Sequence, residues 1–307
     1  MIKNFKKLTA IGAAVALTLG LTACGGSGGA AASAGSTGAA GTELASGSAE
    51  NTSKSGQVFR TLDEIKESGE INIGVFSDKS PFGYVDENGD YQGYDIYFAD
   101  RLAKDLGVKA NYVSTEAANR IEYLQTGKVD VILANFTVTD ERKEEVDFAL
   151  PYMNVSLGVV SPSDKVVKSL DDLTADDPVI VISGTTAETY LIENYPNLTL
   201  QKYDTYANAK NALENGNGVA WVNDNTEVLA FASENDGYEV GIATLGSKDT
   251  IAPAVTKENQ TLLDAINGEI KSLGEEQFFH KDYEETLVDT YGADYEDELV
   301  VEGGVTE

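Results

Sequence analysis

Cysteine is nearly absent from this 307-residue chain, which contains one cysteine, one histidine and six prolines. A single cysteine excludes an internal disulfide framework and zinc sites built from several thiolates. The chain also lacks a glycine-rich phosphate loop and any recognisable nucleophile motif. We therefore expect a fold that is stable by packing alone, without metal, cofactor or catalysis. We expect the lone histidine, His280, to be a packing or surface residue.

Basic residues are scarce as well. The chain has 22 Lys and Arg against 51 Asp and Glu, which gives a formal net charge of -29. Loss of the three lysines that precede residue 24 (Lys3, Lys6 and Lys7) would lower the charge to -32. Such a surface repels nucleic acid and anionic lipid headgroups and favours solubility. We therefore expect no nucleic-acid partner.

Long apolar runs are limited to one stretch, residues 8–21, which is shorter than the roughly 20 residues that span a bilayer. It follows the three lysines and precedes Leu21-Thr22-Ala23-Cys24, the pattern of an export signal. A cysteine at the cleavage point resembles a bacterial lipoprotein signal, in which the thiol takes a diacylglyceryl group. We predict a signal peptide over 1–23, lipidation of Cys24 and an extracytoplasmic, membrane-anchored protein. The alternatives are cleavage elsewhere, with Cys24 an ordinary small residue, or an apolar anchor.

The rest of the chain divides into a tether and a folded part. Residues 24–56 are rich in Gly, Ala and Ser and lack hydrophobic periodicity, which predicts a flexible tether. Short apolar runs then alternate with helical patterns, which predicts an α/β fold with parallel sheets covered on both faces. In such folds, ligands bind where strands end and helices begin. The predicted strands are 71–75, 129–134, 155–160, 179–182 and 219–222, and the predicted helices are 95–106, 118–126, 139–146, 185–194, 207–214 and 225–234.

Three of these strand-to-helix junctions carry candidate binding residues. After the second strand, Thr139 is a candidate N-cap and Arg142 a candidate clamp for a carboxylate, although Arg142 could instead pair with Glu144 or Glu145. Residues 183–188 offer free amides and the Thr185 and Thr186 hydroxyls to an anion, or Thr185 only caps the helix with Glu188 completing a capping box. Asp224 could accept an ammonium group or serve as an N-cap. Together these groups suit a zwitterionic α-amino acid.

Several short motifs occur in a distinctive order along the folded part. They are Ser80-Pro81-Phe82-Gly83, Gly93-Tyr94-Asp95-Ile96, Gly127-Lys128-Val129-Asp130, Thr137-Val138-Thr139-Asp140-Glu141-Arg142, Val146-Asp147-Phe148 and Pro151-Tyr152. In this order they resemble the bacterial extracellular solute-binding proteins, family 3, of polar amino acid ABC transporters. The resemblance implies a type II periplasmic-binding-protein-like fold, with two Rossmann-like α/β lobes on a two-strand hinge that closes on the ligand. Lobe 1 would span 57–151 plus 250–295, lobe 2 would span 152–249, and 296–307 would form an acidic tail, whose packing the sequence leaves open.

The resemblance also assigns roles to particular residues. It places the guanidinium clamp on Arg142 and polar contacts on Asn135 and Thr137. It places the carboxylate donors of the second lobe on Thr185 and Thr186, and the ammonium acceptor on Asp224.

Two positions depart from the family pattern. Lys79 stands at a usual aromatic position, and residues 116–120 lack a second frequent aromatic. Arg120 in that segment would face an anionic or polar ligand side chain, or else lie on a helix surface paired with Glu116 or Glu122.

The implied function is capture of a polar L-amino acid by a lipid-anchored, monomeric receptor that delivers it to an ABC permease and its ATPase subunit. Cysteine is the preferred ligand, because residues 117–124, 134–137, 183–190 and 251–255 look like the cysteine-binding branch. Glutamate/aspartate-binding and glutamine-binding proteins are the alternatives within this fold. A dehydratase-type enzyme on the same fold and a surface adhesin are the alternatives of other classes.

Overall fold

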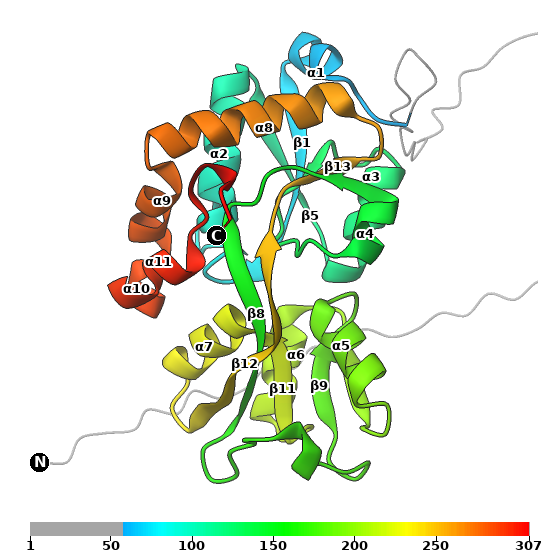
Figure 1. Ribbon diagram of the computed structural model, residues 1–307, viewed down its shortest axis with the longest axis vertical. Helices are drawn as coiled ribbons and strands as arrows, with labels where there is room; N and C mark the ends of the chain where they lie inside the picture. Colours follow the sequence, from blue (N-terminus) through cyan, green and yellow to red (C-terminus); the bar gives the residue numbers. More distant parts are fainter. Residues whose placement is uncertain (1–57, 307) are drawn as a thin grey trace, which may run out of the picture. The chain divides into compact units, whose positions relative to one another are not determined.

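The computed structural model describes residues 58–306. The predicted signal peptide, Cys24 and the tether lie outside the described residues. The described part forms two α/β lobes, each built on one five-stranded sheet, and two strands run between them (Figure 1). The predicted arrangement of two α/β lobes on a two-strand hinge is thereby confirmed.

The first lobe is assembled from both ends of the described chain. Its sheet has the order β5-β1-β6-β13-β7, and a small sheet β2-β3-β4 lies beside it. The strands are β1 (Glu70–Val75), β2 (Asp78–Lys79), β3 (Gly83–Val85), β4 (Tyr91–Gln92), β5 (Lys109–Ser114), β6 (Val131–Ile132), β7 (Val146–Phe148) and β13 (Ala254–Thr256). The helices are α1 (Leu62–Ser68), α2 (Tyr94–Leu106), η1 (Ala117–Asn119), α3 (Arg120–Gln125), α4 (Asp140–Glu145), α8 (Gln260–Glu275) and α9 (Phe278–Thr286).

The second lobe is one continuous stretch of chain. Its sheet has the order β10-β9-β11-β8-β12. The strands are β8 (Met153–Pro162), β9 (Val179–Ile182), β10 (Leu200–Tyr203), β11 (Ala220–Asp224) and β12 (Tyr238–Ile251). The helices are η2 (Leu170–Asp172), α5 (Thr186–Asn194), α6 (Tyr206–Glu214) and α7 (Asn225–Glu234).

Both sheets are mixed, so the prediction of parallel sheets is wrong in part. Strand β1 pairs in parallel with β5 and β6, and β9 pairs in parallel with β10 and β11. Strand β13 is antiparallel to β6 and β7, and β8 is antiparallel to β11 and β12. The reason is the hinge: the chain leaves the first lobe along β8 and returns along β12, so these strands run in opposite directions.

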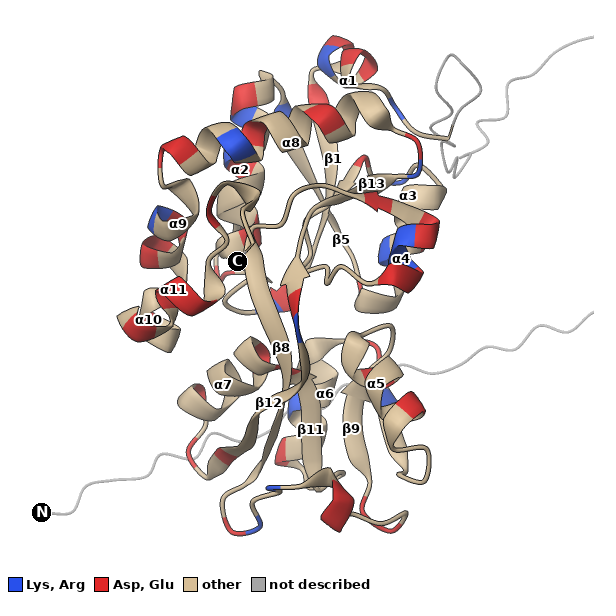
Figure 2. Cartoon of the chain, viewed as in Figure 1, with Lys and Arg blue, Asp and Glu red and all other residues tan. Residues whose placement is uncertain are grey.

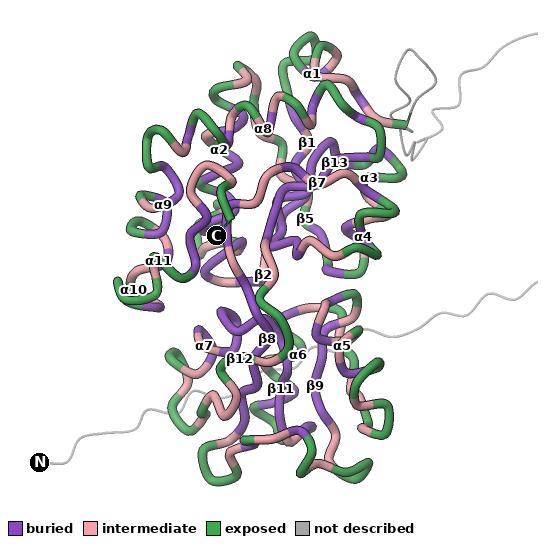
Figure 3. The backbone as a smooth tube through the Cα atoms, in the orientation of Figure 1, coloured by how far each residue is buried: buried purple, intermediate pink, exposed green. Residues whose placement is uncertain are grey.

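The strands of the second sheet form the centre of that lobe (Figure 3). All four residues of β9 and all five of β11 are buried. Strands covered on both faces read as continuous apolar runs, which explains why these segments were recognisable from sequence. Trp221 in β11 is fully buried and packs edge-on against Phe231 of α7, with ring centroids 5.7 Å apart. This packing fixes the ends of β9 and β11, where their loops begin.

The C-terminal residues 288–304 pack against the hinge. They form α10 (Val288–Tyr291) and η3 (Ala293–Tyr295) and, within the predicted acidic tail, α11 (Glu296–Leu299) and η4 (Glu302–Gly304). The Val301 amide donates to the Tyr152 carbonyl at 3.1 Å, just before β8. The Tyr291 hydroxyl donates to the carbonyl of Thr226 in the second lobe at 3.0 Å. Residues 288–301 therefore contact both lobes, a result that the sequence left open.

Charged residues are frequent on the outer helices, such as α8 and α9 (Figure 2). His280 of α9 belongs to this surface, where its Nδ1 lies 2.7 Å from a Glu302 oxygen. None of the helices between residues 58 and 306 combines the length and apolar character that crossing a membrane requires.

Candidate functional site

Seven of the eight predicted binding residues line one small chamber between the lobes, and the eighth, Lys79, bonds to two of them. The chamber measures about 10 Å³, roughly the space of one water molecule. It lies where β6, β9 and β11 end and their loops begin, as the strand-end rule predicts. The lining residues are Arg120, Asn135, Thr137, Arg142, Thr185, Thr186, Tyr206 and Asp224.

Lys79 joins the two lobes through a buried ion pair. Its Nζ lies 2.8 Å from Asp224 Oδ2 and 2.6 Å from Asn135 Oδ1, and the side chain is fully buried. Burial is the largest single influence on the pKa of Lys79 and acts to lower it, but Asp224, Tyr206 and Glu227 together outweigh burial, and the pKa is raised. The ammonium also lies 4.8 Å from the centroid of the Tyr206 ring. The predicted acceptor of a ligand ammonium is therefore shared with a lysine of the chain itself.

Asp224 occupies the N-cap position of α7, one of its two predicted roles, yet its side chain makes no capping hydrogen bond. One carboxylate oxygen, Oδ2, accepts from Lys79. The Asp224 side chain thus pairs with Lys79 of the other lobe instead of capping α7, and its carboxylate lies at the wall of the chamber.

Asn135 holds an unusual backbone conformation at the wall of the chamber. Its φ of 45° is left-handed, which asparagine tolerates better than most residues. Its amide donates to Asp95 Oδ2 at 2.8 Å, and burial raises the pKa of Asp95 to about 6. Its side-chain Nδ2 is buried without a hydrogen-bond partner in the described part of the chain. Such a donor is costly to leave unpaired and suits an acceptor inside the chamber.

Arg142 is buried and points back over the start of its own helix. Its N-cap, Thr139, accepts a hydrogen bond from the Arg142 amide, as predicted. The guanidinium donates to the Thr137 carbonyl at 2.7 Å and to the Gly184 carbonyl at 3.0 Å. Within residues 58–306 it pairs with no carboxylate, so the alternative of an exposed pair with Glu144 or Glu145 is wrong. Burial, followed by the positive charge of Arg120, lowers the pKa of Arg142 to about 9.

Arg120 is buried too, which rules out the alternative of a surface pair with Glu116 or Glu122. Its guanidinium donates to the carbonyls of Ala117 and Ala134 at 3.0 Å, and to those of Asn135 and Gly184 at 3.2 Å. All of these acceptors are neutral, so no carboxylate is hydrogen-bonded to the guanidinium, although the charges of Asp224 and Asp95 act on it from a distance. Burial lowers the pKa of Arg120 below its usual range.

Gly184 is where the second lobe meets both arginines. Its carbonyl accepts from Arg120 and from Arg142, and its φ of 77° is left-handed. A Cβ at this position would lie 2.5 Å from Ala118 Cα on the first lobe. Only glycine permits this approach, so the contact belongs to a closed arrangement of the two lobes.

Thr185 caps α5, as predicted. Its hydroxyl accepts from the Glu188 amide at 3.3 Å and donates to the Ile182 carbonyl at 2.7 Å. The Glu188 carboxylate reaches the Gly184 amide at 2.7 Å instead of the Thr185 amide, so the capping box is displaced by one residue. Because the Thr185 hydroxyl proton is already donated, the anion donors left here are the Thr186 hydroxyl and the free amides of the first helical turn.

Tyr206 lines the chamber and was missed by the sequence reasoning. It begins α6 after a two-residue turn from β10, the same kind of strand end that identified the other residues. Strand β10 was not predicted, so its end was not inspected. Burial raises the pKa of Tyr206 to about 12, and the hydroxyl is therefore neutral near pH 7. Asp95, which holds Asn135 in place, was quoted only as part of a motif.

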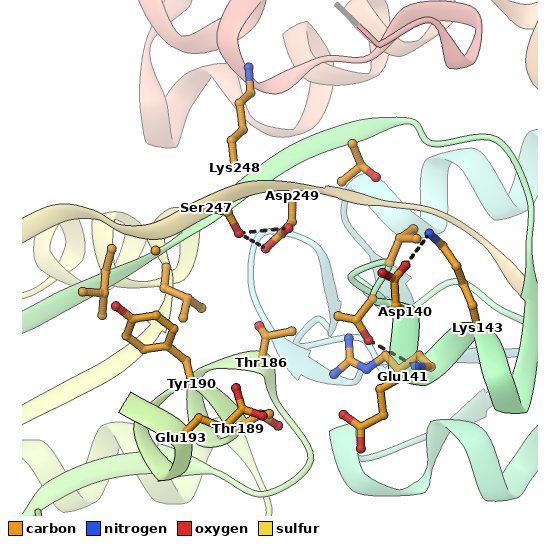
Figure 4. Close-up of a pocket in the computed structure, with 17 residues that line it drawn as sticks. Asp140, Glu141, Lys143, Thr186, Thr189, Tyr190, Glu193, Ser247, Lys248 and Asp249 are labelled. Carbon is orange, nitrogen blue, oxygen red and sulfur yellow. Dashed lines mark hydrogen bonds and ion pairs between the residues drawn. The ribbon is translucent and has the colours of Figure 1, made fainter. Parts of the chain in front are cut away.

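A much larger cavity of about 590 Å³ opens beside the chamber and shares Arg142 and Thr186 with it. Figure 4 shows α4 with Asp140, Glu141 and Lys143 facing α5 with Thr189 and Tyr190 across it. Residues 245–250 of the hinge strand β12 form the third side. Despite its size it has an exposed, mixed-charge wall, so the small chamber with its buried arginines and unpaired donor is the better candidate site.

The chamber is lined by side chains of both charge signs. His280, the candidate for a general acid or base in the enzyme alternative, is not among its lining residues. No group of His, Cys, Asp and Glu suited to a metal ion is found among residues 58–306. The arrangement brings cationic and anionic side chains to one chamber, as a small ligand with an anionic and a cationic group would require.

Comparison with known proteins gives matches over most of the chain. The sequence model of a family described as bacterial extracellular solute-binding proteins, family 3, matches residues 71–286. A solved solute receptor for L-cysteine of Neisseria gonorrhoeae is 48% identical, with a TM-score of 0.77, and the match covers 79% of this chain and 100% of that one. A cysteine-binding protein from Campylobacter jejuni is also 48% identical, with a TM-score of 0.77 and coverage of 78% and 98%. The ABC transporter glutamine-binding protein GlnH of Bacillus subtilis (strain 168) is 31% identical over 236 residues, which is 75% of this chain and 84% of that protein.

Proposed function

Because the chain belongs to the bacterial extracellular solute-binding proteins, family 3, we propose that it is the receptor of an ABC importer and captures a polar L-amino acid, with cysteine as the preferred ligand. Its two lobes have the type II periplasmic-binding-protein fold that the sequence resemblance implied. The captured amino acid would pass to a membrane permease driven by an ATPase subunit.

One observation carries the proposal: two buried arginines without carboxylate partners in the described residues face the same chamber as a buried aspartate. An α-amino acid brings the complementary pair of charges. Arg142 and the first-turn amides near Thr186 would hold the α-carboxylate, because guanidinium and helix N-terminal amides both favour anions. Asp224 and Thr137 would hold the α-ammonium. The unpaired Asn135 Nδ2 supplies a further donor to the ligand.

Binding requires the lobes to move. A chamber of about 10 Å³ cannot admit an amino acid, so the lobes must first part along the hinge. Arg142 belongs to the first lobe, whereas Thr186 and Asp224 belong to the second. Only a closed form lets one ligand contact both sets of groups, so binding shifts the open–closed equilibrium towards closed.

The choice of cysteine rests on the absence of a stacking platform and on likeness. The rings of Phe76 and Phe136 lie against Arg120 instead of forming a platform for a long side chain. Two of the solved structures that match the chain are named for cysteine binding. Glutamine and glutamate or aspartate are the competing ligands, since GlnH is named for glutamine.

Calorimetric titration of the purified protein against the twenty L-amino acids tests the proposal, with a non-thiol reductant present for cysteine. We expect cysteine to bind most tightly. Heat from none of the twenty would refute the receptor function, and tighter binding of glutamine would refute the choice of cysteine. Arg142→Met should abolish binding, whereas Arg101→Met, which removes a surface ion pair with Asp105, should not.

The membrane attachment is a separate part of the proposal. Cys24 would carry the lipid and residues 24–56 would act as the tether to an extracytoplasmic membrane face. Two acyl chains bury enough CH₂ groups, at about 0.8 kcal/mol each, to hold a protein stably. Cells fed a labelled fatty acid should label the wild-type protein and not Cys24→Ser. Equal labelling of both would refute lipidation at this residue.

A further inference from the structure

The walls of the chamber carry more positive than negative charge. Lys79, Arg120 and Arg142 are all buried around it, and Asp224 is the one carboxylate among its lining residues. Asp224 is already paired with Lys79. The two arginines donate only to main-chain carbonyls, which carry no net charge.

The neighbouring ionisable groups do not remove this surplus. Asp95 does not line the chamber but accepts a hydrogen bond from the amide of Asn135, which does, and its single charge offsets at most one cation. Glu227 is matched by Lys210, whose Nζ lies 3.0 Å away. Asp249 and Glu141 face Arg142 from the open cavity, where solvent screens them. A zwitterion adds no net charge, so at least one buried positive charge would remain after it binds.

We propose that the site takes its amino acid with one net negative charge, so that cysteine is held as the thiolate. This inference rests on the function proposed above. The S–H bond breaks on binding, the electron pair stays on sulfur, and the proton passes to the buffer while the α-ammonium is retained. Adjacent lysine and arginine side chains lower the pKa of a thiol, which is ordinarily about 8.5. A ligand with a side-chain carboxylate meets the same requirement without releasing a proton.

Calorimetry in two buffers of different ionisation enthalpy measures the released protons. The full chain is titrated at pH 7 with L-cysteine and, as a control, with L-serine, whose hydroxyl stays protonated. Serine reports any proton exchange of the protein itself, for example at Asp95 or Arg142. We expect cysteine to release close to one proton more than serine, and its affinity relative to serine to rise about tenfold per pH unit from about pH 6 to 8. Binding of cysteine without excess proton release would overturn the inference and leave the receptor function intact.

Two lysine variants test whether the buried cations cause the proton release. Lys79→Met removes one buried cation of the chamber, and we expect it to reduce the excess proton release at pH 7. Lys143→Met removes a cation of α4 that is exposed and paired with Asp140, and it should leave the release unchanged. Equal effects of the two variants would refute a role for the buried charge.

The test also separates this inference from the choice of ligand. If cysteine gives no heat in either buffer, the proposed ligand is wrong. The charge inference then predicts that glutamate and aspartate bind at least about tenfold more tightly than glutamine and asparagine. Preference for the amides would overturn the charge inference as well.

Discussion

Substitution of Gly184 by alanine should open the protein without unfolding it. The added Cβ would lie 2.5 Å from the Ala118 Cα and 2.7 Å from the Ala118 amide nitrogen, both main-chain atoms of the other lobe. Neither atom can move aside alone, so the lobes must separate by about 1 Å, the shortfall from ordinary van der Waals contact. The two arginine hydrogen bonds to the Gly184 carbonyl, at 3.0 and 3.2 Å, would then lengthen.

The magnitude follows from these contacts. A hydrogen bond to a charged group contributes about 1.5–3 kcal/mol, so weakening two of them costs the closed form about 3 kcal/mol. The left-handed φ of 77° adds about 1–2 kcal/mol, but it does so in the open and closed forms alike. Only the first cost shifts the equilibrium. Since each 1.4 kcal/mol is tenfold, the ligand affinity of Gly184→Ala should fall about 100-fold.

The assay pairs calorimetry for affinity with small-angle X-ray scattering for the distance between the lobes. Gly216→Ala is the matched control, because Gly216 lies in the same lobe with a φ of 70° and has nothing within 4 Å of an added Cβ. It should lose stability to a similar extent and keep its affinity. If Gly184→Ala binds as tightly as Gly216→Ala, the contact with Ala118 does not control closure and the argument fails.

Three further predictions concern the charges of the chamber. Arg142→Met should weaken ligand binding at least about 100-fold and change the free energy of unfolding little, because a buried guanidinium without a carboxylate stabilises poorly; a large loss of stability in urea would contradict this. Lys79→Met leaves Asp224 buried without its cation and should lower the free energy of unfolding, measured in urea, by about 3–5 kcal/mol. The double variant that also carries Asp224→Asn should recover part of this loss. If the losses of the two single variants simply add in the double variant, the ion pair does not stabilise the fold. Burial raises the pKa of Asp95 to about 6, so the folded state holds this proton more tightly than the unfolded state, and stability should fall by up to about 3 kcal/mol as pH rises from about 3 to 7. Asp95→Asn should flatten that slope in urea unfolding followed over this pH range, and an unchanged slope would assign the loss to other groups.

The sequence predicted best those elements whose signals are local. Helix α7 was predicted over 225–234 and has those bounds, and β9 was predicted over 179–182 and has those bounds too. Helix α2 ends at Gly107 because this residue takes the left-handed conformation that glycine allows. Strand β6 covers only Val131–Ile132 of the predicted 129–134, and the chain then takes a left-handed conformation at Asn135, whose amide donates to Asp95.

The features that sequence reasoning could not settle depend on distant partners. Asp224 looked equally like an N-cap and an ammonium acceptor, because its partner Lys79 is 145 positions away. Surface ion pairs were plausible for Arg120 and Arg142 for the same reason. The Gly184 carbonyl, which accepts hydrogen bonds from both arginines, belongs to the other lobe and is distant in the sequence. Glutamates close to each arginine in the sequence suggested surface ion pairs, but both arginines are buried and do not form them. The order of motifs, read as a family resemblance, supplied what local chemistry lacked.

The discontinuous first lobe has a consequence for how the chain acquires its structure during synthesis. Strand β13 lies between β6 and β7, yet it comes after β12, the last strand of the second lobe. A chain growing from its N-terminus therefore completes the second lobe first. Until β13 has been made, the edges of β6 and β7 that pair with it stay unpaired. Unpaired edges favour pairing with other chains. We expect a chain stopped after β12 to keep a protease-resistant second lobe and to aggregate through the unfinished first one.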